Sequence, residues 1–339
     1  MESTQHNLIS RLDAYKKPSS PRAIFELAVT GGALLAMWSV AFLVFHLGFW
    51  WLALILTAPA ALFLVRLFMI QHDCGHGAFF SAKAANDWVG RVIGVLTLTP
   101  YDYWRRTHAV HHATSANLDR RGLGDIKTLT VDEYLALTPM KRFGYRLYRH
   151  PLVLFGLGPF FTFFLMQRLP FGLFKDGWRP WLSTMGTTVA ALAVLAVFAW
   201  LLGPAPTLLV FLPTMLIGAT IGVWLFFVQH QFEGVTWLRQ GKWRRDDAAL
   251  LGSSHYDLPQ PLKWLTANIG VHHVHHLSSR IPFYRLPQVM KDLPELKNVS
   301  RLGLIESFKC ASLAVFDEAN GRLISFRQMR RMRLASAGA

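Results

Sequence analysis

Charged residues are scarce in this sequence. Asp, Glu, Lys and Arg make up only 16% of its 339 residues, and hydrophobic residues make up 52%. Soluble domains carry about 25% charged residues, so the deficit argues for a chain that meets lipid. The charges present are mostly basic, with 35 Lys and Arg against 20 Asp and Glu. In so apolar a chain this excess indicates an anionic membrane face or an acidic protein partner, and no nucleic acid.

Cysteine is almost absent, since Cys74 and Cys310 are the only two. Two thiols cannot hold an iron–sulfur cluster or a four-thiolate zinc site, and they do not make a disulfide scaffold. The zinc-hydrolase motif His-Glu-x-x-His is also missing, which argues against a non-redox zinc hydrolase. Histidine, by contrast, occurs 14 times, and its spacing indicates a metal site.

Four apolar runs are long enough to cross a bilayer, which takes about 20 helical residues. They cover residues 26–47, 49–70, 184–202 and 207–229. The joints within each pair are short and uncharged, so we expect two tight hairpins. The rest of the chain would form a helical cap, from residues 71–183 and 230–339. We therefore predict one all-α integral membrane domain over residues 1–339.

Basic residues precede the first run and fill both cap segments. By the positive-inside rule the termini and the cap are cytoplasmic, in what we expect to be a bacterial inner membrane. The first run follows polar residues without a cleavage site, so we expect an anchor and not a cleaved leader. Residues 88–100 and 151–169 are shorter or flanked by charge. Either could be a fifth span, but we favour a position in the membrane interface or against the cytoplasmic cap.

Three histidine clusters have the spacing of one helical face, on which residues three and four apart are neighbours. A further histidine directly follows the fourth run. Together the candidate ligands are His72, His76, His108, His111, His112, His230, His272, His275 and His276. His273 falls off the shared face, and we interpret His255 as a non-ligand. Nine imidazoles suit two metal ions, because one tetrahedral zinc takes four ligands. Imidazole binds zinc, copper, iron and nickel, so the ligands alone leave the metal open.

At these residues the sequence resembles the membrane fatty acid desaturases, which share a superfamily with alkane and carotenoid oxygenases. The resemblance covers about residues 60–290. It implies two iron ions, with O2 as co-substrate, beneath a cytoplasmic cap. It places one iron on His72, His76, His108, His112 and His275, and the other on His111, His230, His272 and His276. It also suggests that Asn268 contacts a metal ligand or reaches the metal through a water molecule. Some relatives place such an Asn where this chain has Phe226.

Residues next to the histidine clusters narrow the resemblance to one subgroup of desaturases. Two segments are similar to those of desaturases that insert a second double bond: His72-Asp73-Cys74-Gly75-His76, and Pro100-Tyr101 with Trp104. Residues 281–284 resemble the Ile-Pro-His-Tyr of those enzymes, with Phe283 in place of His. We therefore expect a fatty acyl desaturase that forms a cis double bond in a membrane-lipid chain, of Δ12/ω6 type. The alternative is a related diiron oxygenase, a hydroxylase or ketolase of an alkane, sterol or carotenoid.

Such a reaction takes O2 and two electrons. We find no flavin-, haem- or cluster-binding motif, including the His-Pro-Gly-Gly of a fused cytochrome b5 domain. The electrons must then come from another protein, and we expect a ferredoxin. Basic residues that could steer it, or face anionic headgroups, are Arg239, Lys242, Arg244, Arg245, Arg327, Arg330, Arg331 and Arg333.

Other charged residues near the clusters are candidates for supporting roles. A carboxylate can orient a metal-bound imidazole by accepting its second N–H, and the candidates are Asp73, Asp102, Asp125 and Glu233. Arg66 is expected to reach the interface or to brace a carboxylate. Arg105 and Arg106 are candidate contacts for a lipid phosphate.

Overall fold

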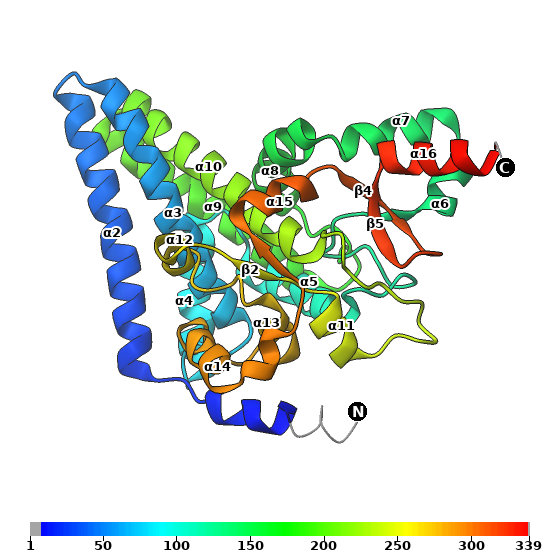
Figure 1. The fold of residues 1–339 in the computed structure, drawn as a ribbon. Helices are drawn as coiled ribbons and strands as arrows, with labels where there is room; N and C mark the ends of the chain where they lie inside the picture. Colours follow the sequence, from blue (N-terminus) through cyan, green and yellow to red (C-terminus); the bar gives the residue numbers. More distant parts are fainter. Residues whose placement is uncertain (1–7, 338–339) are drawn as a thin grey trace.

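Four long apolar helices dominate the computed structural model, which describes residues 8–337. Each is long and apolar enough to cross a membrane, and they are α2 (Ser20–His46), α3 (Trp50–Gly75), α9 (Trp178–Leu202) and α10 (Pro204–His230). They form two hairpins whose tight joints lie at one end of the molecule (Figure 1). The predicted fold class, a largely helical chain with four membrane helices and a cap, is confirmed.

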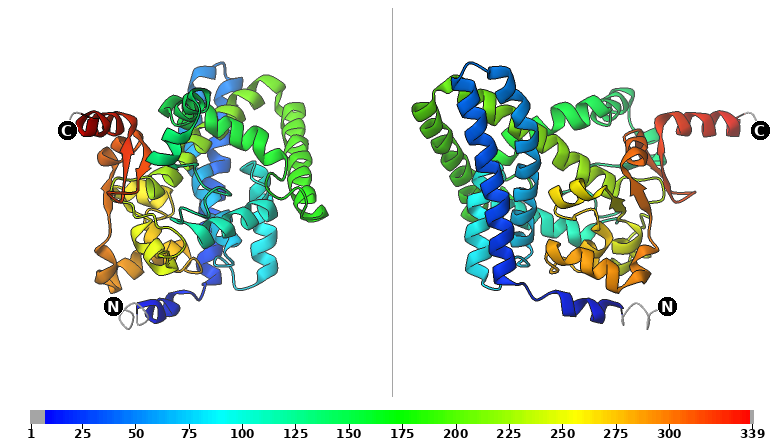
Figure 2. Two further views of the ribbon diagram at one scale, coloured as in Figure 1. Left: turned by 90° about the vertical axis from the view of Figure 1, so that its right-hand side faces the viewer. Right: turned by 60° about the vertical axis from the view of Figure 1, so that its left-hand side comes forward.

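The membrane helices run further into the cap than the apolar runs suggested. α3 continues past residue 70 to Gly75, and α9 begins at Trp178 where the run begins at 184. In α3 the extension is the first histidine cluster, whose polar residues end the apolar run but not the helix. The cap lies against one side of the helices (Figure 2), so the extension of α3 carries the first histidine cluster into the cap.

The stretch around residues 151–169 is a broken helix. It consists of η2 (Val153–Leu157), α8 (Gly158–Phe160), η3 (Phe161–Leu165) and η4 (Met166–Arg168), in which η2 and η3 are π-helical. Pro159 lacks the backbone N–H that a regular helix needs. The segment bends by 59° from α7 (Pro139–Tyr148), and makes a fifth span only if the bent pair is counted as one. The other ambiguous stretch, residues 88–100, lies mostly in α4.

Shorter helices build the cap. They are α4 (Lys83–Leu96), α5 (Tyr101–Thr114), α6 (Val131–Ala136), α11 (Arg245–Leu251), α12 (Gln260–Leu265), α13 (His272–Leu277), α14 (Leu286–Asp292), α15 (Leu304–Cys310) and α16 (Phe326–Ala337). Single 3-10 turns occur at η1 (Asp13–Tyr15), η5 (Phe283–Arg285) and η6 (Pro294–Lys297). α5 and α13 carry the second and third histidine clusters.

Short strands, absent from the sequence prediction, fasten the C-terminal part of the chain to the cap. β4 (Leu313–Asp317) pairs parallel with β1 (Leu129–Thr130) and antiparallel with β5 (Arg322–Ser325). β2 (His255–Asp257) pairs parallel with β3 (Arg301–Gly303). A small core of Tyr134, Tyr145, Val315, Ile324 and Met329 forms beneath the first of these sheets.

A buried ion pair links two membrane helices to the cap. The guanidinium of Arg66 on α3 meets the carboxylate of Glu26 on α2, and both side chains are almost fully buried. Arg66 also donates to the carbonyl of Trp264. Of the two roles expected for Arg66, the structure therefore favours bracing a carboxylate. An ionisable pair inside a membrane protein persists only with such partners.

Candidate metal centre

The first cluster lies where α3 ends. His72 is in the last turn and His76 caps the helix, so their rings lie 4.7 Å apart between centroids. Gly75 between them faces Trp104. A Cβ at this position would lie 2.8 Å from Cζ3 of Trp104, closer than a side chain tolerates. The first cluster therefore needs a glycine at position 75, because the indole of Trp104 packs on the backbone there.

The second cluster is set against the first by α5. The hydroxyl of Tyr101 donates to the carbonyl of Cys74 at 2.8 Å. One turn later the Trp104 ring stacks on His108, with 4.5 Å between centroids and 16° between planes. The Pro-Tyr-x-x-Trp segment thus fixes the second cluster on the end of α3.

The third cluster and the lone histidine come together from α13 and the end of α10. Gln229, beside His230, donates from Nε2 to the carbonyl of Ile269 at 3.1 Å. Gly270 lies so close to Tyr256 that a Cβ would be 2.2 Å from its carbonyl oxygen. These contacts hold α13 against α10, with every histidine of α13 buried.

The ring nitrogens gather in two groups. One comprises His72, His76, His108, His112 and His275, and the other comprises His111, His230, His272 and His276. Within each group one nitrogen from every ring lies within 4.8 Å of the others. The division is the one that the family resemblance implied. His273 lies in neither group, and its Nε2 donates to the carbonyl of Leu296 at 2.9 Å. The His255 ring lies beside His273.

The spacing of the nitrogens suits coordination of a metal ion. Nε2 of His230 lies 3.1 Å from that of His111 and 2.9 Å from that of His272. In the other group Nε2 of His112 lies 3.1 Å from those of His108 and His275. Two nitrogens at right angles around one ion, each at about 2.1 Å, would be about 3.0 Å apart.

Two buried nitrogens make the same point. Nε2 of His76 and Nε2 of His276 have no hydrogen-bond partner among the residues that the structure describes. A buried polar atom without a partner is unfavourable, and a metal ion would satisfy it.

Burial also sets the charge of the rings. It lowers the pKa of six imidazoles in the cap well below the usual 6.5, because water cannot solvate the charged form and the neighbouring rings would repel it; they are His76, His108, His112, His272, His275 and His276. These rings are neutral at pH 7, which is the form that binds metal.

Two of the four candidate carboxylates contact a histidine. Nδ1 of His111 donates to Oδ1 of Asp125 at 2.5 Å, and Nδ1 of His72 lies 3.4 Å from Oδ1 of Asp73. Asp73 also accepts a hydrogen bond from the backbone N–H of Phe283 at 2.7 Å. This bond joins the first histidine cluster to the segment that follows the third cluster. Asp102 instead pairs with Arg91 at 2.8 Å, and Glu233 is exposed.

Other suggested partners lie apart from the rings. Arg105 pairs with Asp87 and Arg106 with Asp176, both at 2.7 Å, so neither guanidinium depends on a lipid phosphate for a partner. Asn268 adopts a left-handed backbone with φ of 55°. Within residues 8–337 no hydrogen bond joins its side chain to a histidine.

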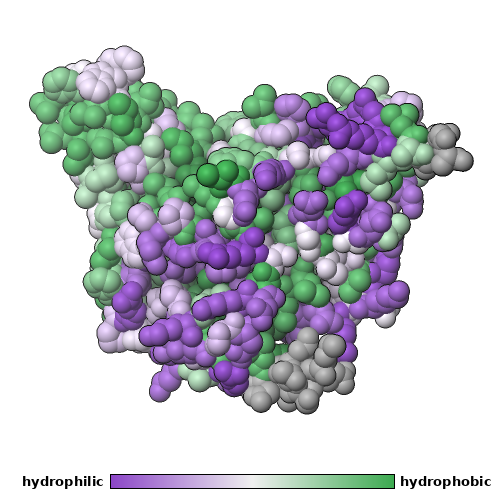
Figure 3. Space-filling model, in the orientation of Figure 1, coloured by the Kyte–Doolittle hydropathy of each residue, from purple (hydrophilic) through white to green (hydrophobic). Residues whose placement is uncertain are grey.

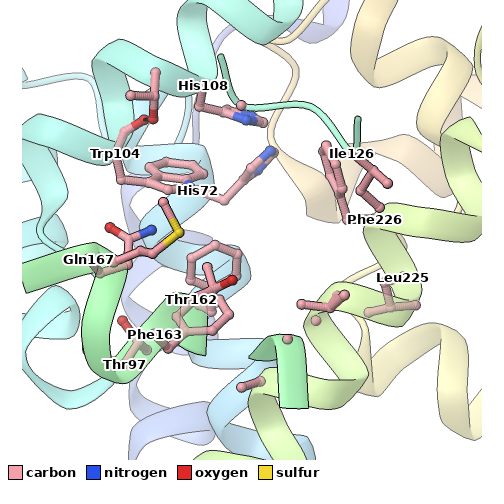
Figure 4. Close-up of a pocket in the computed structure, with 18 of the residues that line it drawn as sticks. His72, Thr97, Trp104, His108, Ile126, Thr162, Phe163, Gln167, Leu225 and Phe226 are labelled. Carbon is pink, nitrogen blue, oxygen red and sulfur yellow. Dashed lines mark hydrogen bonds between the residues drawn. The ribbon is translucent and has the colours of Figure 1, made fainter. Parts of the chain in front are cut away.

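A largely apolar cavity of about 520 Å³ opens onto both groups. His72 and His108 of one group and His272 of the other line it, beside Trp104 and Phe226. Figure 4 shows His72 and His108 at one side of the space, with Phe163 and Leu225 on walls further along. The volume lies within the range of about 300–1,000 Å³ for ligand pockets.

The cavity walls were not identified from the sequence. Gly218, Ala219 and Gly222 of α10 line the cavity, with open space beside Gly222, and the broken segment contributes Thr162 and Phe163. Two glycines four apart lie on one helical face, so the α10 wall had a usable signal. The broken segment had none, because its helix type changes along its length. Buried Arg149 was also missed; it donates to Gln231, the neighbour of His230, at 2.9 Å.

Comparisons with known proteins point to one family. The fatty acid desaturase family model matches residues 49–302. A fatty acid desaturase of Bacillus subtilis is 40% identical, over 96% of this chain and 92% of that protein. The sn-1 acyl-lipid omega-3 desaturase (ferredoxin) of Synechocystis is 29% identical, over 65% of this chain and 61% of that protein. The sn-1 oleoyl-lipid 12-desaturase of Anabaena variabilis is 27% identical, over 74% of this chain and 73% of that protein. With a buried histidine centre, membrane helices and a matching family model, this chain belongs to the fatty acid desaturases and is an oxidoreductase.

Proposed function

We propose that the chain is an O2-dependent diiron desaturase that forms a cis double bond, of Δ12/ω6 type, in the acyl chain of a membrane lipid. The observation that carries this proposal is the contact between the cavity and both histidine groups. An apolar space lined in part by His72, His108 and His272 suits an alkyl chain whose reacting carbons would lie beside both ions.

The metal site is assigned to the nine histidines. His72, His76, His108, His112 and His275 would hold one iron, and His111, His230, His272 and His276 the other. When bound, the irons supply the O2-dependent oxidation of an unactivated C–H bond, which no acid–base side chain can perform. The net reaction takes two electrons, two protons and O2, removes hydrogen from two adjacent carbons, and yields a double bond and two waters.

The protein positions and shields the reacting carbons. Asp125 fixes the tautomer and orientation of His111 by accepting its Nδ1–H. Trp104 holds His108 by stacking. The apolar walls exclude water and align one pair of methylenes with the centre. Regioselectivity then depends on how far the chain extends past His72 and His108.

The lipid substrate and the position of the double bond are inferred from relatives. The cyanobacterial relatives are named for sn-1 acyl lipids and, in one case, for position 12 of an oleoyl chain. The Bacillus subtilis relative carries only the general name. Because these names describe desaturases, they favour desaturation over the hydroxylase or ketolase alternative.

The electron donor would be a separate protein. One relative is named as ferredoxin-dependent, and we assign the same class of donor here. We place the termini and the cap in the cytoplasm of a bacterial cell, since the basic residues lie there. Steering by residues 239–245 should be weak, because Arg239 is paired with both Asp119 and Glu318 at 2.8 Å.

Expression in a host that makes only saturated and monounsaturated lipids tests the proposal. Gas chromatography of the lipids should reveal a new diunsaturated chain with its second double bond at Δ12. A hydroxylated or oxidised product without a new double bond would support the oxygenase alternative. A new double bond at another position would support the desaturase assignment and refute the Δ12/ω6 assignment.

A further inference from the structure

α7 has its apolar side facing outward. Its inner side packs on the small β-sheet through Tyr145, whose hydroxyl donates to the carbonyl of Ala314 at 2.6 Å. Its outer side carries Met140, Phe143 and Leu147, which are 78%, 63% and 51% exposed. Three large apolar side chains in one stripe on a helix surface mark a contact with something apolar.

The stripe continues into a wider apolar surface, which we call the outer band. Its residues are Met140, Phe143, Leu147, Leu152, Leu157 and Phe308, and all are exposed. Phe308 contacts Trp224 of the membrane helix α10, and Trp224 contacts Phe155 of the broken segment, with ring centroids 5.4 and 4.9 Å apart. These contacts join the outer band to α10, which is long and apolar enough to cross a membrane.

α16 begins next to α7, because Phe326 at its start lies near Tyr145 and Arg146 of α7, and it supplies positive charge (Figure 1). Its inner side packs through Met329, which is buried. Its outer side bears four exposed arginines and no acidic residue: Arg327, Arg330, Arg331 and Arg333. Figure 3 shows hydrophilic and hydrophobic residues side by side over these two helices.

We propose that α7 and α16 form a second membrane contact, separate from the four spans. The outer band enters the interface of the same bilayer, and the arginines of α16 bind the phosphates of its anionic lipids. An amphipathic surface with large apolar side chains beside basic ones has the composition of interfacial membrane helices. A bilayer fits better than an acidic protein, because Phe308 and the broken segment join the outer band to the apolar helix α10.

Depth measurement on the full chain tests this contact. A cysteine at Phe143 would carry an environment-sensitive fluorophore, and native Cys74 and Cys310 are buried and should not react. Ala319, exposed in the turn between β4 and β5 that points away from α7 and α16, provides the control position. The protein is placed in nanodiscs of phosphatidylcholine with or without phosphatidylglycerol.

The label at position 143 should be quenched by lipid-attached quenchers and protected several-fold from aqueous iodide, and the label at 319 should show the reverse. Phosphatidylglycerol should increase the lipid quenching at 143. Replacing Arg327, Arg330 and Arg331 together by Gln should remove that increase. If Phe143→Cys does not fold, Met140→Cys serves at the same stripe.

Equal iodide access at 143 and 319 would overturn the proposal. If lipid quenching of the label at 143 changes neither with phosphatidylglycerol nor with the arginine replacements, the proposed role of α16 is overturned. Protection at 143 that appears only when a ferredoxin is added would assign the surface to a protein partner instead.

Discussion

The indole ring of Trp104 lies parallel to the imidazole ring of His108, with 4.5 Å between centroids and 16° between planes. The same indole packs on the backbone of Gly75 in the first histidine cluster. One side chain therefore holds the first two clusters at a fixed separation, and both supply ligands to the same proposed iron.

Replacing Gly75 by Ala should disturb this arrangement. The new methyl group would lie 2.8 Å from the indole, and forcing a packed ring aside costs about 1–3 kcal/mol. We expect desaturation to fall at least about tenfold, the equivalent of 1.4 kcal/mol, with partial loss of iron. Gly186→Ala on α9, where the methyl group meets open space, should leave activity unchanged. Equal activity in the two variants would contradict the role of Trp104.

Asp125→Asn should weaken binding of the second iron, which is assigned to the group containing His111. The amide cannot accept the Nδ1–H of His111 as strongly as a carboxylate, and loss of such a partner typically reduces metal affinity or activity about 10–100-fold. Iron content and turnover of the purified variant measure this effect. Asp132→Asn, an exposed acid in the first turn of α6, is the control. Retention of full iron and turnover by Asp125→Asn would remove Asp125 from the centre.

Gly222→Leu should shorten the space for the acyl chain. Gly222 lines the cavity, and nothing lies within 4 Å of a Cβ at this position. We expect products from longer chains to decline relative to shorter ones in lipid profiles from expressing cells. Gly186→Leu adds the same side chain to another membrane helix away from the cavity. An unchanged profile with Gly222→Leu would place the acyl chain elsewhere.

The proposed orientation has a direct test in whole cells. A cysteine at exposed Ala205, in the first turn of α10 next to the second joint, should react with a membrane-impermeant thiol reagent from outside. A cysteine at exposed Arg120, in the cap, should react only after the membrane is opened. The opposite pattern would invert the topology.

Local periodicity made the candidate ligands visible in the sequence. His72 and His76 are one helical turn apart, so their shared face follows from spacing alone, as it does for the clusters on α5 and α13. The same argument separated His273 from its neighbours. The division into two groups needed the family resemblance, because it depends on how three helices meet.

Features that depend on distant parts of the chain were not visible. Asp102 and Asp125 both lie near the second cluster in sequence, yet only Asp125 reaches His111, because the loop through Gly124 folds back over α5. Gly124 has φ of +84°, and a Cβ there would lie 3.0 Å from the carbonyl oxygen of Thr107. The pairing of β1 with β4 likewise joins segments far apart in sequence, and Leu129–Thr130 is too short to show a strand pattern.

Metal analysis of the purified full chain tests the central claim most directly, with His275→Ala and His273→Ala as a matched pair from one helix. Both side chains are buried on α13, but only His275 belongs to a histidine group. The account predicts two irons in each wild-type chain. It also predicts loss of iron and activity in His275→Ala, with iron and a substantial part of the activity retained in His273→Ala. A wild-type chain that binds a single zinc, or equal loss of iron from the two variants, would contradict it.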